Sequence, residues 1–137
     1  MTKYSKFTFG KDAITEPVDG RDHFWHYSPD HTKGAGIIMV KVVMAKGGKH
    51  DFHRHPEMNE IIYVLKGTAE QWIEDESKIL VSGDSIYIDP DIVHATFNTG
   101  DEDLEFLAIL SPKEGWEAGT IDEYMNAPYN TYKKNNT

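Results

Sequence analysis

Cysteine is absent from this chain of 137 residues. Its absence excludes disulfide bonds, thiolate metal ligands and a cysteine nucleophile, and it agrees with a reducing compartment. Long apolar runs are also absent: none approaches the ~20 residues that cross a membrane, and the first residues lack the apolar core of a secretory signal. We therefore expect a cytoplasmic protein without a membrane partner.

Basic residues are outnumbered by acidic ones. The chain has 14 Lys and Arg against 23 Asp and Glu, which gives a formal net charge of −9. Nucleic-acid backbones are bound by clustered Lys and Arg that release counterions, and anionic membrane surfaces attract the same side chains. The charge therefore argues against both partners. The length is that of one domain, which buries roughly 70% of its unfolded surface.

The residues that carry chemistry are concentrated in one run, GGKHDFHRHPEMNEIIYVLKG, which holds His53, His55 and Glu60; His94 follows in a later run. Alternate side chains of a β-strand share a face, so His53 and His55 lie together. Pro56 cannot donate to a sheet ladder and should end or bend this strand, after which Glu60 opens a strand that can return beside it. Three imidazoles and one carboxylate are a usable ligand set for a first-row divalent metal.

This run resembles the first sequence motif of the cupin superfamily. Every fixed position of that motif is matched, by Gly47, His53, His55, Glu60 and Gly67. The resemblance implies a small single-domain cupin, whose fold is a double-stranded β-helix, the jelly-roll barrel. It also implies that one divalent metal per chain is held inside one end of the barrel. The absence of thiolates favours Fe, Mn, Ni or Zn as the metal.

The second cupin motif is matched in part. Gly83, His94 and Asn98 occupy its glycine, histidine and asparagine positions, whereas Asp89 and Asp91 replace its proline and its second glycine. The two motifs span about the middle two-fifths of the chain. By the usual pattern of the family, the metal ligands would be His53, His55, Glu60 and His94.

Short apolar stretches between turn residues predict an all-β protein. Roughly six to eight strands, with turn signals about every 8–12 residues, describe a barrel or a sandwich, and the resemblance selects the jelly roll. We expect three segments: an N-terminal strand or flap over 1–34, the barrel over 35–112, and a mostly irregular extension over 113–137. The first segment is either a surface strand ending in a turn or a flap that brings His26 near the substrate. The extension should hold a short helix around 120–126.

Two expected strands, 60–65 and 104–110, are apolar on both faces. A strand with one solvated face alternates apolar and polar residues, so we expect both faces of these strands to be covered. Either a second layer of the same chain or a partner subunit could provide the cover. We predict a homodimer on this basis.

Other residues are candidates for supporting roles around the ligands. Thr96 shares a strand face with His94, and Gln71 lies at the centre of a neighbouring strand, so both could support the ligands from behind. His50 has the opposite strand parity to His53, and we expect it to face solvent rather than the metal. The candidates for the mouth of the barrel are Phe52, Met58, Gln71, Tyr87 and Phe97.

Three functions are compatible with such a site and a small oxygenated ligand. The first is an oxidoreductase of the dioxygenase type, which the resemblance favours because Fe(II)-dependent dioxygenation is common among small cupins with this ligand set. The second is an isomerase, decarboxylase or lyase with Zn, Mn or Ni as a Lewis acid. This second function needs a general base, for which Glu60, Tyr87 and His26 are candidates. The third is a binding module that catalyses nothing.

Overall fold

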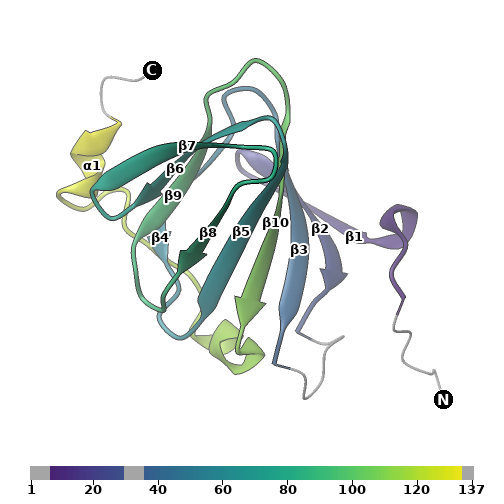
Figure 1. Cartoon of the computed structure of the whole chain (residues 1–137). Helices are drawn as coiled ribbons and strands as arrows, with labels where there is room; N and C mark the ends of the chain where they lie inside the picture. Colours follow the sequence, from purple (N-terminus) through teal and green to yellow (C-terminus); the bar gives the residue numbers. More distant parts are fainter. Residues whose placement is uncertain (1–6, 30–35, 134–137) are drawn as a thin grey trace.

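Two antiparallel sheets form the body of the protein in the computed structural model, which describes residues 7–29 and 36–133 (Figure 1). The six-stranded sheet has the order β1 (Ile14–Val18), β2 (Arg21–Tyr27), β3 (Ile38–Met44), β10 (Leu104–Ser111), β5 (Asn59–Lys66) and β8 (Ser85–Ile88). The five-stranded sheet has the order β11 (Ile121–Asp122), β4 (Lys49–Arg54), β9 (His94–Asn98), β6 (Thr68–Ile73) and β7 (Glu76–Val81). The described helices are η1 (Gly10–Asp12), η2 (Lys113–Ala118) and α1 (Tyr129–Tyr132).

The expected all-β jelly roll is therefore confirmed. Its strands form where β-branched and other apolar residues alternate between faces. In β3 every second residue is buried, and the residues between them are partly exposed. The main core fills the space between the sheets and draws on β3, β5, β8, β10 and β6. Burial of alternate residues is the pattern that sheets packed face to face require.

The outer face of β5 was expected to be covered either by a second layer of the chain or by a partner subunit, and the described residues do not provide such a layer. Ile61, Tyr63 and Leu65 are 41%, 42% and 39% exposed, whereas Ile62 and Val64 on the other face are buried. The apolar residues of β5 thus form an exposed strip on the six-stranded sheet.

In the turn before β9, Asp91 occupies the position at which the second cupin motif has glycine. Its φ is +68°, in the left-handed region that Asp adopts more readily than most residues. Its backbone N–H donates to the carbonyl of His55 at 2.8 Å, and its carboxylate accepts a hydrogen bond from Arg54. The substitution is therefore compatible with the turn, because backbone and side-chain contacts both hold it.

The C-terminal extension does not contain the helix expected around 120–126. There the chain forms β11, in which Asp122 pairs with His53 of β4, and the backbone N–H of Glu123 donates to the carbonyl of Phe52. Pairing with the open edge of β4 satisfies backbone groups that a short, poorly capped helix would leave exposed. The short helix α1 lies later, beside the five-stranded sheet (Figure 1).

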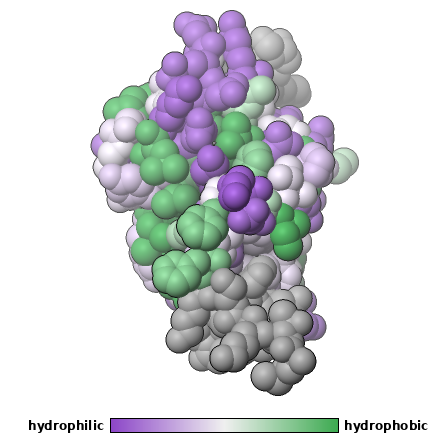
Figure 2. Space-filling model, turned by 90° about the vertical axis from the view of Figure 1, so that its right-hand side faces the viewer, coloured by the Kyte–Doolittle hydropathy of each residue, from purple (hydrophilic) through white to green (hydrophobic). Residues whose placement is uncertain are grey.

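The N-terminal segment contributes two strands to the six-stranded sheet. β1 pairs with β2, and β2 pairs with β3. The side of the molecule that carries these strands shows apolar and hydrophilic groups next to one another (Figure 2).

The expected boundary between residues 34 and 35 lies outside the described residues, and the division into three segments stays a prediction. None of the helices in the described ranges is long and apolar enough to cross a membrane.

Candidate metal centre

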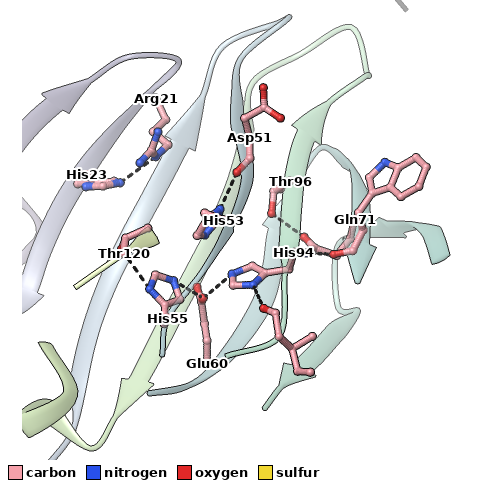
Figure 3. Close-up of polar contacts among 12 residues, drawn as sticks. Arg21, His23, Asp51, His53, His55, Glu60, Gln71, His94, Thr96 and Thr120 are labelled. Carbon is pink, nitrogen blue, oxygen red and sulfur yellow. Dashed lines mark hydrogen bonds and ion pairs between the residues drawn. The ribbon is translucent and has the colours of Figure 1, made fainter. Parts of the chain in front are cut away.

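Four buried side chains point toward one another between the two sheets (Figure 3). His53 comes from β4, His55 follows that strand, Glu60 lies on β5 and His94 opens β9. One ligand atom from each lies within 4.8 Å of the others. The pairing of β4 with β9 sets His53 opposite His94, and the return of the chain into β5 supplies Glu60. The structure thus brings together all four residues that the cupin resemblance implied.

Backbone carbonyls orient two of the histidines. Nδ1 of His53 donates to the carbonyl of Asp51 at 2.6 Å, and Nδ1 of His94 donates to the carbonyl of Ile92 at 2.9 Å. A carbonyl oxygen can only accept, so both Nδ1 atoms carry their proton. The Nε2 atom of each neutral ring then presents a lone pair, which is the state that a metal ligand needs.

The third histidine is oriented by a residue far along the chain. Nδ1 of His55 lies 3.1 Å from the hydroxyl of Thr120, and its Nε2 lies 3.2 Å from Oε1 of Glu60. Thr120 precedes β11, which pairs with β4 and holds this hydroxyl beside the ring. No sequence motif surrounds Thr120, so its position beside the ligands could not be predicted from the sequence.

The geometry between His94 and Glu60 shows that the cluster fits a cation. Nε2 of His94 lies 3.1 Å from Oε1 of Glu60. With the proton of His94 on Nδ1, both facing atoms are acceptors, and two acceptors in contact are unfavourable unless a proton or a cation lies between them. A divalent metal would accept lone pairs from His53, His55 and His94 and neutralise the carboxylate. Three nitrogens and one oxygen without a thiolate suit Fe, Mn, Ni or Zn.

The electrostatics of the cluster favour these ligand states. Burial raises the pKa of Glu60, but the imidazoles of His55 and His94 beside its carboxylate lower it more, so the pKa of Glu60 lies well below its usual range. Burial lowers the pKa of His53 well below its usual value, and the neighbouring histidines lower it further. An ionised carboxylate and a neutral imidazole are both able to bind a metal.

His50 does not face solvent, and the expectation that it would was wrong. Its ring stacks on that of His53, with a centroid distance of 3.5 Å and an angle of 8° between the planes. Burial lowers the pKa of His50 well below its usual value, and the charge of Arg21 acts in the same direction. The pairing of β4 with β9 shifts register between His50 and His53. This irregularity reverses the strand parity, so both rings reach the same face.

A cavity of about 310 Å³ opens beside the cluster, and all four cluster residues line it. Its polar wall includes Arg21, His23, His50 and Asp122, which sequence reasoning did not assign to a site. Arg21, His23 and Trp25 alternate along β2, and this spacing of two was a signal that they share a face. The aliphatic and aromatic side of the cavity comes from β3, β5 and β10, through Val40, Val42, Ile62, Phe106, Ala108 and Leu110.

The two residues expected behind the ligands are in contact. The hydroxyl of Thr96 donates to Oε1 of Gln71 at 2.6 Å, and Nε2 of Gln71 donates to the carbonyl of Trp72 at 3.1 Å. Thr96 lines the cavity, whereas Gln71 is 2% exposed and does not line it. Gln71 is therefore connected to the cavity through its hydrogen bond with Thr96.

The other candidates for the mouth of the barrel lie elsewhere. Phe52 and Phe97 pack in a second cluster with Trp72, Tyr129 and Tyr132. These phenylalanines alternate with His53 and Thr96 along their strands, so they face away from the cavity. The remaining candidates outside the cavity lining are Met58, which is in the main core, and Tyr87, which is 53% exposed and donates to Oδ1 of Asn59 at 2.7 Å.

Two of the proposed general bases also lie outside the cavity. Neither Tyr87 nor His26 is among the residues that line it, whereas Glu60 is. β2 has an irregularity in its pairing with β3 between Trp25 and Tyr27, where His26 is located. The described residues provide other ionisable groups within the cavity, namely His23, His50 and Asp122.

Comparisons with known proteins agree with this fold. The family model described as Cupin domain matches residues 40–110. The uncharacterized protein MJ1618 of Methanocaldococcus jannaschii is 30% identical over 95 residues, which cover 69% of this chain and 76% of that protein. The glucose-6-phosphate isomerase of Thermococcus kodakarensis is 35% identical over 80 residues, which cover 55% of this chain and 42% of the enzyme. The chain thus spans less than half the length of that enzyme.

Solved structures show the same architecture at low sequence identity. The polyketide cyclase RemF from Streptomyces resistomycificus has a TM-score of 0.75 and 18% identity, and the match covers 95% of this chain and 93% of that one. An oxalate oxidase has a TM-score of 0.70 and 22% identity, with coverage of 85% and 62%. These similarities establish the fold of the chain.

Proposed function

The chain belongs to the cupin family, and from this premise we propose that it is a metal-dependent enzyme acting on a small oxygenated molecule. One observation supports the proposal above the others: the buried His53, His55, Glu60 and His94 cluster forms part of the wall of a cavity. The cavity volume, about 310 Å³, lies at the lower end of the ~300–1,000 Å³ typical of ligand sites.

Each part of the cavity has a chemical role in this proposal. A divalent metal bound to the cluster would supply Lewis acidity and, if redox-active, a site for O₂. The backbone of Asp51 and Ile92 and the hydroxyl of Thr120 hold the three imidazoles in place. The aliphatic wall excludes water from the bound molecule, which strengthens polar interactions at the cluster.

The first candidate reaction is oxidation of the dioxygenase type. It needs a redox-active metal with free coordination positions, and it does not need a separate general base. A ligand set of three histidines and one glutamate without thiolates supports this candidate. The fold that the chain shares with an oxalate oxidase is compatible with it.

The second candidate is an isomerase, decarboxylase or lyase without redox change. Its general base could be His50 or Asp122, which line the cavity and are not members of the four-residue cluster. The sequence similarity to glucose-6-phosphate isomerases supports this alternative. A module that binds a small ligand without turnover is the third candidate, and it would lack any metal-dependent activity.

Metal analysis of tag-free protein, purified without added metal or chelator, tests the proposal. We expect about one divalent metal per chain, because the donor set is complete. Iron would lead to oxygen-uptake assays with phenols, diketones and thiols, with chelator-treated protein as the control. Zinc, manganese or nickel would favour isomerase or lyase assays. Protein that stays metal-free after reconstitution with all four ions would contradict the proposal.

We also propose that two copies of the chain associate through the exposed apolar strip of β5. Ile61, Tyr63 and Leu65 would pack against the same strip of the second copy in an isologous interface. Light scattering at micromolar concentration should give about twice the chain mass of 15.6 kDa, and Tyr63→Lys should lower the mass toward that of one chain. Ile14→Lys, a change at an exposed position of β1, is the matched control. A monomer mass for the unsubstituted protein would refute the interface.

A further inference from the structure

The two arginines of the chain have opposite environments. Arg54 is paired with two carboxylates: it donates to Asp91 and, at 2.8 Å, to Glu123. Arg21 lies within the cavity lining, and no carboxylate oxygen of the described residues is within 4.0 Å of its guanidinium. A half-buried arginine without an ionic partner is uncommon, because desolvation of the charge is costly. Arg21 is therefore free to bind an anion, whereas the guanidinium of Arg54 is already paired with two carboxylates.

The protein holds the Arg21 guanidinium in a fixed orientation. Its Nε donates to Nε2 of His23 at 3.1 Å, and its Nη1 donates to the carbonyl of Asp19 at 3.0 Å. His23 must then carry its proton on Nδ1, which lies 3.1 Å from Oε1 of Glu16. The same oxygen accepts from Nε1 of Trp25 at 3.1 Å. A chain of hydrogen bonds from Glu16 through His23 thus positions Arg21, and Figure 3 shows the last of them, between His23 and Arg21.

Nη2 of Arg21 makes no hydrogen bond to any described residue. Burial lowers the pKa of Arg21, and the charge of Asp122 acts in the opposite direction. A guanidinium still remains protonated at neutral pH. The group is therefore a positioned cation with unused donors, located in the same cavity as the metal cluster.

We propose that the substrate is a small organic carboxylate, and that Arg21 binds its carboxylate group while a second oxygen of the molecule faces the metal cluster. This inference rests on the proposed function, and it adds a class of substrate and a residue that selects it. Among the described residues that line the cavity, Arg21 is the sole Lys or Arg. One guanidinium matches the charge of one carboxylate and can bind it in a bidentate manner.

The remainder of the cavity defines the rest of the molecule. Trp25 and Trp116 have their rings in edge contact at 5.4 Å and line the cavity, as do aliphatic residues of β3 and β10. Such a wall suits an apolar body between the two polar ends. The substrate class is therefore a carboxylate with an apolar carbon skeleton and a further hydroxyl or carbonyl oxygen. A phosphate ester fits less well, because phosphate sites gather several donors.

Benzoate and benzamide test the inference, because they share a shape and differ in charge. Calorimetric titration of the purified protein, with its metal content measured on the same sample, should show benzoate binding about tenfold or more tightly than benzamide. Arg21→Gln should remove this preference and leave metal content unchanged. Arg21→Lys should retain part of it, because the charge remains without the planar fork. Arg54→Gln is the matched control and should bind benzoate as the unsubstituted protein does.

Repeating the titration after chelator treatment separates this inference from the proposed function. Preference for benzoate that persists without metal and is lost in Arg21→Gln supports carboxylate binding by Arg21, even if no metal activity is ever found. A preference that vanishes with the metal and survives in Arg21→Gln assigns the carboxylate to the metal and overturns the inference. Equal binding of benzoate and benzamide, or tighter binding of inorganic phosphate than of benzoate, overturns it as well.

Discussion

Replacement of His94 by alanine is expected to lower the affinity for a divalent metal by tenfold or more. His94 is 1% exposed, and its Nε2 atom faces the cluster because its Nδ1 atom is bonded to the carbonyl of Ile92. Loss of groups that merely orient a ligand typically costs ~10–100-fold in affinity, so loss of a ligand should cost at least as much. His53→Ala should behave in the same way.

Competition with a coloured chelator measures this affinity directly. His26→Ala is the matched control, because His26 is a histidine of β2 that does not line the cavity, and its metal affinity should stay within about twofold of the original. Circular dichroism of each variant would show that the fold is retained. Full metal occupancy in both His53→Ala and His94→Ala would disprove the ligand assignment.

Replacement of Phe52 by alanine is expected to lower the free energy of unfolding by about 3–5 kcal/mol. Phe52 is 1% exposed, and its ring centroid lies 5.6 Å from that of Trp72, 5.9 Å from Phe97 and 5.4 Å from Tyr129. Removing the ring leaves a cavity on the side of the five-stranded sheet that faces away from the metal cluster. The same contacts hold the C-terminal helix α1 against that sheet.

Equilibrium unfolding in urea tests this expectation, provided that the slope with denaturant is the same for both proteins. Phe9→Ala is the matched control: Phe9 is 64% exposed, and its loss should change the free energy by no more than about 0.5 kcal/mol. Phe52→Leu, which removes less volume, keeps the comparison possible if the alanine variant does not fold. A loss of under about 1 kcal/mol for Phe52→Ala would mean that the aromatic cluster adds little to stability.

The placement of Phe52 shows how far strand parity can be used. Its position directly before His53 implies the opposite face of the strand, and the structure has it there. The same alternation of side chains places Phe97 and Thr96 on opposite faces of β9. Both phenylalanines were candidates for the barrel mouth, and neither lines the cavity, because the alternation of each strand turns its phenylalanine to the other face.

His50 shows where the same rule fails. Counting along a regular strand places it opposite His53, yet the two rings stack. The register shift between β4 and β9 is the cause. A bulge of this kind depends on how two strands meet, and neither strand carries a local signal for it.

The sequence by itself determined the all-β class and, through its resemblance to the two cupin motifs, the set of four residues that form the cluster. Strand alternation, turn glycines and the spacing of His53, His55 and Glu60 are local features. Each involves residues that are close in the sequence, so it can be recognised without knowledge of the fold. Only the tertiary structure decided that Arg21 and Thr120 reach the same cavity. These residues lie in strands or turns far from the cluster in sequence, and the pairing of β2 with β3 and of β11 with β4 brings them there. Contacts between distant segments depend on the whole fold, because packing and pairing are satisfied together rather than segment by segment.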